Sequence, residues 1–475
     1  MINLEKRLAF WAGLKPNEVA FVDGKKEITF AELQIHTLKV ASVLSSYGVK
    51  SGDLVCTVLS ASLDWPVILA LQLLGATSFA KPGLVTFDLY AAPDWLIAGS
   101  EHPHFSKEKT ILVNESFAQA VNDSELFKTS DSAFDPARPI RLSSTSGTSG
   151  EVKYLAFTES EIYERLLAPS VVNFVGNGKF LNLMLFGAAQ SYNWAHRALL
   201  EGKTFYTSKS SDEGIFEMLA KYGIATIYGS PQQISVAAET IQRLGHKLSG
   251  KFNLVLGGSA PSMKLLENIR KNHNSLIINS LGSAETGFIA MLDFSKENSR
   301  GLVIHPNSVV EVLDENKKIL NTEEVGILRY KIPGAANSYF NNLEASKSNF
   351  EDGYFYSGDM GYKTLDGRLF ITGRSNEVIN LGGVKVNPEQ IDEIVLSEPG
   401  IADAAAFALD DESGVPKLAI ALVVDNEFDE AEFVQKMKGK FTRAKIEGIF
   451  RVNAIPRNPN GKIIRRELNR KFSKQ

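Results

Sequence analysis

Apolar runs with the length of a strand alternate with helix-like runs along most of this chain. The run DLVCTVLS at 53–60 reads as a buried strand, and WPVILALQLLGA at 65–76 follows it as a helix that ends at Gly75. Strand, glycine turn and helix return in the same order at 251–272, where Pro261 stands near the first turn of the helix. This alternation predicts an α/β fold, in which helices cover the faces of a parallel sheet.

Three segments rich in glycine and serine lie where loops would follow the strands, at 143–150, 257–259 and 282–287. In open α/β sheets, ligands bind beyond the carboxyl ends of the strands. We therefore expect ligand-binding residues in these three loops.

The pattern changes after residue 394. Two strand-like runs and one amphipathic run follow, at 401–411, 417–425 and 430–441. They are typical of a small α+β domain, and 475 residues are too many for one hydrophobic core. The polar, glycine-rich segment GRSNEVINLGG at 373–383 is the expected boundary, which predicts a large domain at 1–375 and a small domain at 376–475.

Cysteine usage, apolar run lengths and net charge exclude several classes of protein. Cys56 is the one cysteine, which rules out an intrachain disulfide and a cysteine cluster for catalysis or metal binding. The start MINLEKRLAF lacks the apolar core of a signal peptide, and the best apolar run falls short of the roughly 20 residues that span a bilayer. A net charge of −4 gives no general attraction to nucleic acid or membranes. We expect a cytoplasmic protein with no membrane span and no nucleic-acid partner.

Positive charge is concentrated near the end of the chain. Residues 436–475 contain 13 Lys or Arg and two Glu. One interpretation is an ordinary solvated surface. The other is a face for an anionic partner, such as a phosphate-rich cofactor or an acidic protein.

Every residue from 143 to 150 is Ser, Thr or Gly, and Lys153 follows shortly after. Hydroxyl groups, backbone N–H groups exposed by glycine, and a lysine together form a cradle for an anion. The spacing differs from the P-loop pattern G-x-x-x-x-G-K-[ST], because Lys153 comes three residues after Gly150 and precedes Tyr154. The flanking runs PIRL and VKYLAF predict a hairpin whose ends are tied. From these residues alone, a phosphate loop and a flexible surface loop are both possible.

The stretch STSGTSGEVK at 144–153 resembles the phosphate loop of the adenylate-forming superfamily, which comprises acyl-CoA synthetases, peptide-synthetase adenylation domains and beetle luciferases. Other stretches resemble further motifs of that superfamily in the same order: ITFAEL (28–33), LQLLGA (71–76), GGSAPS (257–262), LGSAETG (281–287), YFYSGDMGY (354–362), GRLFITGRSNEVINLGGVKVNPEQIDEIV (367–395) and NPNGKIIRREL (458–468). The resemblance implies a large N-terminal domain of layered α/β subdomains and a small, mobile α+β C-terminal domain.

The resemblance also implies an activity and a set of site residues. Members of the superfamily activate a carboxylic acid with ATP, which gives acyl-AMP and pyrophosphate, and a thiol usually then takes the acyl group. Lys462 would be the catalytic lysine, and Glu285 would help to hold Mg²⁺. The β- and γ-phosphates would be bound by Thr145, Ser146, Gly147, Thr148, Ser149, Gly150 and Lys153. Adenine and ribose would be bound by Gly258, Ser259, Ala260, Pro261, Leu281, Gly282, Ser283, Asp359 and Arg374.

Two half-reactions at one site imply that the small domain rotates about a hinge. Asn376 stands at the hinge position, where the superfamily usually has Asp or Lys. Gly382 and Gly383 would let the pantetheine arm of the thiol pass close to the backbone. Two further departures concern the nucleotide: Leu281 replaces an aromatic residue that stacks on adenine, and Ala284 replaces a threonine that bonds a phosphate oxygen.

The stretch LFGAAQSYNW at 185–194 aligns with the motif that recognises the acid. Gly187 stands where amino-acid-activating domains carry an aspartate and many CoA ligases carry a histidine. An α-amino acid is therefore disfavoured, because its buried ammonium would have no partner. Candidates for the acid pocket, which could equally be core residues, are Phe186, Gly187, Gln190, Ser191 and Trp194.

We therefore predict an acyl- or aryl-CoA ligase that uses ATP, Mg²⁺ and CoA to convert a small carboxylic acid into a thioester. The stretch LGGVKVNPEQID at 381–392 is closer to the CoA-ligase pattern than to the peptide-synthetase pattern. The alternatives are loading of phosphopantetheine on a separate acyl or peptidyl carrier protein, and ligation to an amine, in natural-product biosynthesis. A nucleotide-binding regulator without catalysis is a hypothesis of another class, prompted by Leu281 and Ala284.

Overall fold

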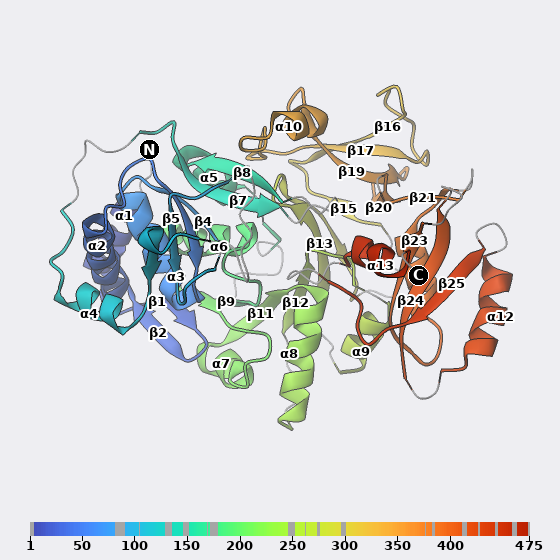
Figure 1. Cartoon of the computed structure of the whole chain (residues 1–475), viewed down its shortest axis with the longest axis horizontal. Coiled ribbons are helices and arrows are strands. Elements are labelled where there is room, and N and C mark those ends of the chain that lie inside the picture. Colours follow the sequence, from blue (N-terminus) through green and yellow to red (C-terminus); the bar gives the residue numbers. More distant parts are fainter. Residues whose placement is uncertain are drawn as a thin grey trace. The chain divides into compact units, whose positions relative to one another are not determined.

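The computed structural model describes residues 4–80, 91–103, 105–128, 135–145, 152–168, 170–171, 179–245, 252–261, 263–272, 276–295, 301–375, 377–381, 385–410, 416–425, 428–441, 445–457 and 463–473. Figure 1 labels the helices and strands of the chain, which divides into two compact units. The first unit comprises Met1–Val255, Gly282–Ile289 and Lys331–Phe355, and the second comprises Leu256–Leu281, Ala290–Tyr330 and Tyr356–Gln475. The predicted functional boundary between residues 375 and 376 stays a prediction.

The first 257 residues alternate between strands and helices as the sequence predicts. Their helices are α1 (Leu4–Leu14), α2 (Phe30–Ser46), α3 (Ala61–Leu73), α4 (Glu115–Asp123), α5 (Glu159–Leu167), α6 (Ala189–Glu201), α7 (Ile215–Tyr222) and α8 (Pro231–Arg243), with a 3-10 turn at Lys107–Lys109. Their strands are β1 (Val19–Asp23), β2 (Lys26–Thr29), β3 (Leu54–Val58), β4 (Thr77–Ala80), β5 (Trp95–Ala98), β6 (Thr110–Leu112), β7 (Pro139–Thr145), β8 (Lys153–Thr158), β9 (Lys179–Asn182), β10 (Phe205–Thr207), β11 (Ile224–Gly229) and β12 (Asn253–Gly257). The helix predicted at 65–76 begins earlier, at Ala61, so that Pro66 lies inside it, and it ends at Leu73.

Two sheets organise the first unit. One has the order β6-β5-β3-β4-β7-β8, and its neighbours are parallel except for the antiparallel pair β7 and β8. The other includes the path β11-β9-β10-β1-β2, which is parallel up to β1 and closes with the antiparallel pair β1 and β2. The expected α/β class, with a mainly parallel arrangement, is confirmed.

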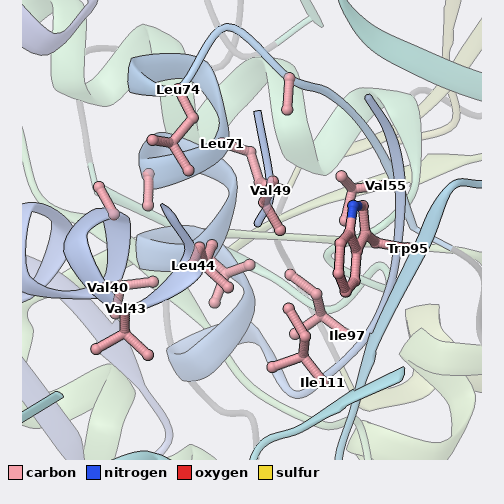
Figure 2. Close-up of a cluster of buried hydrophobic side chains, with 14 of the residues drawn as sticks. Val40, Val43, Leu44, Val49, Val55, Leu71, Leu74, Trp95, Ile97 and Ile111 are labelled. Carbon is pink, nitrogen blue, oxygen red and sulfur yellow. The ribbon is translucent and has the colours of Figure 1, made fainter. Parts of the chain in front are cut away.

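Helices α2 and α3 cover one face of the six-stranded sheet (Figure 2). Leu44 and Leu71 from these helices are fully buried against Val55 and Ile97 from the strands. Each such side chain contributes about 1.5–3 kcal/mol through burial. Trp95 also packs in this core, and its indole N–H donates to Asp53 Oδ2 at 3.0 Å. This core therefore holds β3 and β5, which belong to the same sheet as β7 and β8.

Helix α5 is placed directly by the strand before it. Thr158 ends β8 and caps α5 in a capping box, because its side chain accepts from the backbone of Glu161 and the Glu161 carboxylate accepts in return. The helix therefore starts without a linker and carries Arg165 at a fixed position relative to β8.

Residues after 255 contain short helices and many strands. The helices are α9 (Met263–Asn272), α10 (Leu343–Asn349), α11 (Pro388–Leu396), α12 (Glu430–Lys440) and α13 (Arg465–Phe472). The strands are β13 (Ile277–Ser283), β14 (Gly287–Asp293), β15 (Val303–Ile304), β16 (Val309–Leu313), β17 (Gly326–Lys331), β18 (Phe350–Glu351), β19 (Tyr354–Lys363), β20 (Leu369–Arg374), β21 (Ile379–Asn380), β22 (Lys385–Val386), β23 (Ile401–Leu409), β24 (Lys417–Val424) and β25 (Ile446–Arg451). The strands from β12 onward include two paths of neighbouring strands, β15-β14-β13-β12 and β16-β17-β19-β20.

The segment after α11 has the α+β composition that the sequence predicts. Strand β24 pairs antiparallel with β23 and parallel with β25. One face of this sheet packs on Ile391, Phe433 and Met437 from α11 and α12, and the other packs on Leu468 from α13. None of the helices in the described ranges has both the length and the apolar character needed to cross a membrane.

Asp64 in α3 is a buried acid whose charge costs stability. Burial raises the pKa of Asp64 to about 6, and the nearby Arg141 cation and Thr57 hydroxyl lower it only in part. The folded protein therefore keeps a proton between about pH 4 and pH 6 that the unfolded chain has released, so this group makes the fold less stable as pH rises through that range.

Asp64→Asn should stabilise the protein at pH 7.5 by about 3 kcal/mol and change little near pH 4. Thermal unfolding of both proteins at the two pH values measures this difference. The control is Asp366→Asn, since Asp366 is exposed and hydrogen bonds from Thr364 and Arg368 lower its pKa. An equal gain at both pH values would contradict the assignment to the Asp64 charge.

Candidate active site

The predicted phosphate loop joins two strands of a hairpin. In the antiparallel pair β7 and β8, Thr145 stands opposite Lys153, so both ends of the loop are tied as the flanking runs predict. Thr145 is buried. The loop residues Ser146, Gly147, Thr148, Ser149 and Gly150 lie outside the described residues.

Glu285 lies in the turn that joins β13 to β14, and it is buried. Its Oε1 accepts a hydrogen bond from the hydroxyl of Tyr339 at 2.9 Å. Its backbone carbonyl accepts from the N–H of Ala336 at 2.7 Å. Burial raises the pKa of the Tyr339 hydroxyl, and the Glu285 charge raises it further, so Tyr339 remains a donor at any physiological pH.

Lys153 and Glu285 approach the same tyrosine. The Nζ of Lys153 lies 4.9 Å from the ring centroid of Tyr339, within the range of a cation–π interaction. The backbone N–H of Phe340 donates to the carbonyl of Tyr154 at 2.7 Å, which ties this segment to β8. Tyr339 therefore connects the end of the phosphate loop with the buried carboxylate.

The turn that carries Glu285 depends on a glycine. A Cβ at Gly282 would lie 2.3 Å from the backbone carbonyl oxygen of Gly287, and backbone cannot move aside as a flexible side chain can. Ser283 and Thr286 close the same turn, because the Thr286 N–H donates to Ser283 Oγ at 3.2 Å. Tight pairing of β13 with β14 therefore places Glu285 at the tip of a short, rigid turn.

A buried carboxylate of this kind suits Mg²⁺. Mg²⁺ prefers hard oxygen ligands and is usually bound by one or two carboxylates together with water and substrate phosphates. Among the described residues there is no cluster of three or more His, Cys, Asp or Glu that would hold a metal by protein groups alone. The donor set fits a cation that arrives with ATP.

Asp359 and Arg374 come together in the second unit. They stand opposite each other on β19 and β20, and Arg374 Nε lies 3.0 Å from Asp359 Oδ1. Asp359 Oδ2 accepts from Ser357 Oγ at 2.8 Å and from the Tyr330 hydroxyl at 3.3 Å. The pKa of Arg374 is raised: burial opposes the charge, and Asp359 is the largest of the influences that favour it. A carboxylate oxygen can accept further bonds, so this pair can still receive ribose hydroxyls.

The residues predicted on the adenine side occupy two strand ends. Gly258, Ser259, Ala260 and Pro261 follow β12, before α9. Gly258 has φ +87°, a left-handed conformation that glycine adopts readily. Leu281, Gly282 and Ser283 end β13. The first group therefore lies in a loop that follows a strand, as expected, whereas Leu281, Gly282 and Ser283 belong to β13 itself and the turn after it covers only residues 284–286.

The acid-pocket candidates are mostly buried. Phe186 packs 6.3 Å from the rings of both Phe21 and Trp65. Ser191 Oγ donates to Asn182 Oδ1 at 3.3 Å, and Trp194 donates to Ser170 Oγ at 3.2 Å. Gln190 and Gly187 are half-buried.

Gly187 is restricted both by close packing at its Cα and by a hydrogen bond to its carbonyl. A Cβ there would lie 2.7 Å from the Cβ of Ala80. Its carbonyl accepts a hydrogen bond at 3.3 Å from Nη2 of Arg141, which is fully buried. The sequence did not identify Arg141 or Ala80 as neighbours of Gly187. The only signal for them was that position 187 has no side chain.

Gly187→Ala should therefore destabilise the protein by about 1–3 kcal/mol, because the added methyl overlaps Ala80. Ala80→Gly in the same chain should restore most of the loss, since it removes the opposing methyl. Thermal unfolding of the two single variants and the double variant measures the coupling. If the effects of the two single changes on the free energy of unfolding simply add in the double variant, the proposed overlap between the methyl groups at positions 187 and 80 is contradicted.

The basic excess after residue 436 is partly neutralised by earlier acids. Lys440 Nζ lies 2.5 Å from Glu398, Arg451 Nη2 lies 2.7 Å from Glu430, and Arg465 Nη2 lies 2.6 Å from Asp392. Arg457 also pairs with Asp403 at 2.8 Å. Lys462, Asn376, Gly382 and Gly383 lie outside the described residues.

Comparison with known proteins defines the class of this chain. The family model for AMP-binding enzymes matches residues 92–340, which is more than half of the chain. The chain belongs to this family of AMP-binding enzymes, as its motifs predict. It is 25% identical to a 2-succinylbenzoate–CoA ligase of Bacillus licheniformis, over 96% of this chain and 98% of the relative.

Solved structures have the same fold. The o-succinylbenzoate CoA synthetase of Bacillus subtilis, in complex with the acyl-adenylate intermediate, is similar with a TM-score of 0.82 and 20% identity over 97% of both chains. The same synthetase in complex with ATP and a magnesium ion is similar with a TM-score of 0.82 and 20% identity, over 97% of this chain and 98% of the other. The predicted fold of the superfamily is confirmed.

Proposed function

We propose that this chain activates a carboxylic acid with ATP and transfers the acyl group to CoA. The observation that carries this proposal is the arrangement around Tyr339, which donates to the buried Glu285 carboxylate while its ring lies beside Lys153. A carboxylate suited to Mg²⁺ is thereby connected to the end of a loop rich in hydroxyls and glycine. The relative of Bacillus licheniformis, similar over nearly its whole length, is itself a CoA ligase.

The first half-reaction forms the acyl-adenylate. A carboxylate oxygen of the acid attacks the α-phosphorus, the bond between the α-phosphorus and the bridging oxygen breaks, and pyrophosphate leaves. The loop from Thr145 to Lys153 holds the leaving group, and Asp359 accepts hydrogen bonds from the ribose. Bound Mg²⁺ supplies charge neutralisation on the phosphates. Lys462 bridges the acid and the α-phosphate, which orients the nucleophile.

The second half-reaction forms the thioester. The thiol sulfur attacks the acyl carbon, the bond between that carbon and the phosphate oxygen of AMP breaks, and AMP leaves as the thiol proton is released. We propose that the domain 376–475 rotates about Asn376 between the two steps, and that Gly382 and Gly383 then line the path of the pantetheine arm. The proposed location is the cytoplasm, where a chain with one cysteine needs no oxidising environment.

The proposed acid is an acyl or aryl carboxylate without an α-amino group. Gly187 offers no carboxylate for an ammonium, and its packing against Ala80 leaves no space for one at that position. The similar ligase of Bacillus licheniformis is named for an aromatic acid, 2-succinylbenzoate, which favours starting with aromatic acids.

ATP–pyrophosphate exchange across a panel of aryl, acyl and amino acids tests this proposal, with hydroxylamine to trap the acyl-adenylate. Exchange with at least one non-amino acid is expected. No exchange with any acid, together with intact ATP binding, would instead support the regulator hypothesis.

Loading of a carrier protein is the second candidate, because the basic excess of residues 436–475 would attract an acidic carrier. Thioester yield with CoA and with a holo-carrier protein, measured at equal concentration, separates the two acceptors. An amide product, visible by its mass, would identify ligation to an amine. We expect CoA to be preferred, since ion pairs with Glu398, Glu430, Asp403 and Asp392 occupy several of these cations.

A further inference from the structure

The turn around Glu285 is held by residues from two distant parts of the first unit. Helix α5 provides Arg165, whose Nη2 donates to the carbonyl of Ala284 at 2.6 Å. The segment 331–355 provides Tyr339, which donates to Glu285 Oε1, and Ala336, which donates to the Glu285 carbonyl. The carboxylate, its own carbonyl and the preceding carbonyl therefore each receive a donor.

A buried charged side chain such as Arg165 is unusual beside this turn. It is buried, and its Nη1 has no hydrogen-bond partner among the residues that the structure describes. Keeping such a cation costs free energy unless it compensates another charge. Burial lowers the pKa of Arg165 to about 10, and the Glu285 carboxylate is the largest influence that opposes this decrease. The positive charge of Arg165 and the hydrogen bond from its Nη2 therefore both act on the turn that carries Glu285.

Neighbouring residues fix the position of Arg165. Its guanidinium carbon lies 4.3 Å from the ring centroid of Phe157 in β8. On the other side, a Cβ at Gly334 would come within 3.2 Å of the Arg165 backbone nitrogen, Cα and Cγ, and Gly334 has φ +73°. Close packing of this kind holds the arginine in one orientation, and the capping box of α5 fixes the helix behind it.

Tyr339 is fixed as firmly. Its ring packs edge-on against Phe350 at 5.1 Å, and its backbone N–H donates to Ser346 Oγ at 2.8 Å. Its hydroxyl has one donor hydrogen, which the Glu285 carboxylate receives. Loss of that hydroxyl would leave Glu285 free to rotate while the ring still fills its place.

We propose that Tyr339 and Arg165 are positioning residues that orient the Glu285 carboxylate for the divalent cation that accompanies ATP. The inference rests on the proposed function, since it assumes that Glu285 holds this cation. Groups that orient a metal-binding carboxylate typically change metal affinity 10–100-fold when they are lost. Neither residue needs to touch the cation or the nucleotide.

Tyr339→Phe is the primary test, because it removes one oxygen and keeps the ring. We expect the Mg²⁺ concentration that gives half-maximal ATP–pyrophosphate exchange to rise about tenfold. Binding of Mn²⁺ in the presence of ATP, followed by electron paramagnetic resonance, should weaken by a similar factor. Binding of ATP in EDTA, followed by thermal shift, should stay unchanged.

Tyr222→Phe is the matched control. The Tyr222 hydroxyl also donates to a glutamate, Glu27, at 2.5 Å, but this pair lies at the surface. The control should leave the Mg²⁺ dependence unchanged. For the arginine, Arg165→Lys keeps a cation and should weaken Mn²⁺ binding less than Arg165→Met does.

The outcomes separate this inference from the proposed function. If the unchanged protein gives no exchange with any acid and no stabilisation by Mg²⁺ with ATP, the proposed function fails. If the unchanged protein is active and Tyr339→Phe has the same Mg²⁺ and Mn²⁺ dependence as Tyr222→Phe, the positioning role of Tyr339 is overturned. The Tyr339 variant keeps the test decisive even if Arg165→Met does not fold.

Discussion

Lys462→Ala should lower the rate of ATP–pyrophosphate exchange by roughly 10²–10³, the usual effect of removing a preorganised donor from a developing charge. The motif NPNGKIIRREL at 458–468 is the basis for this prediction. In the adenylation step, the ammonium would bring together two anions, the acid and the α-phosphate, and offset the charge that develops between them. Transfer from acyl-AMP to a thiol involves no such pair.

Thioester formation from supplied acyl-AMP should therefore be preserved in Lys462→Ala. Measuring both half-reactions on the same preparation makes the comparison internal. Lys471→Ala is the control, because Lys471 is an exposed lysine of α13, and both half-reactions should be normal. Normal exchange in Lys462→Ala would sink the assignment of the catalytic lysine.

Asp359→Ala should weaken ATP binding and also destabilise the protein by about 3 kcal/mol. The change removes an acceptor for the Arg374 cation, for Ser357 and for the buried hydroxyl of Tyr330. Each bond to a charged group that ATP loses costs about 1.5–3 kcal/mol, so affinity should fall at least tenfold. Isothermal titration with ATP and thermal unfolding measure the two effects.

The same hairpin supplies a matched control for Asp359. Asp366 pairs with Arg368 at 3.1 Å, but both side chains are exposed, at 67% and 40%. Asp366→Ala should leave stability almost unchanged and ATP binding intact. Asp359→Asn keeps the volume and separates the two roles of Asp359. Full ATP affinity in a folded Asp359→Asn would contradict the ribose assignment.

The hairpin of β7 and β8 shows what local pattern can predict. Strand-like flanks around a Ser/Thr/Gly loop predict a hairpin, because hairpin pairing involves neighbours in the sequence, and the structure adds the register that pairs Thr145 with Lys153. The helix after β8 is signalled as well, since Thr158 and Glu161 have the spacing of a capping box. These local features could be predicted without any tertiary information.

The residues that bond to the turn around Glu285 could not be predicted from local sequence pattern. Tyr339 is 54 residues from Glu285, and Arg165 is 119 residues from Ala284. Neither lies in a motif that signals a role at this turn. A hydrogen bond between such positions depends on how the strands and helices pack, and one sequence contains no record of that packing.

The basic excess at the end of the chain illustrates the same limit for charge. Residues 436–475 contain 13 Lys or Arg, and this number alone is compatible with either a solvated surface or a docking face. The structure pairs several of them with acids that precede them, such as Glu398 and Asp392. Net charge is a property of composition, whereas a free charged surface depends on which partners the fold brings close.

The sequence by itself determined the α/β class, the order of the motifs and therefore the family, because periodicity and contiguous motifs are local. It also identified Glu285 and Asp359 as candidate site residues. Only the tertiary structure decided what holds them: Tyr339 and Arg165 around Glu285, and Arg374 with Tyr330 around Asp359. The physical reason is that orientation, burial and pKa depend on atoms within a few ångströms, which the chain brings together from distant positions only when it folds.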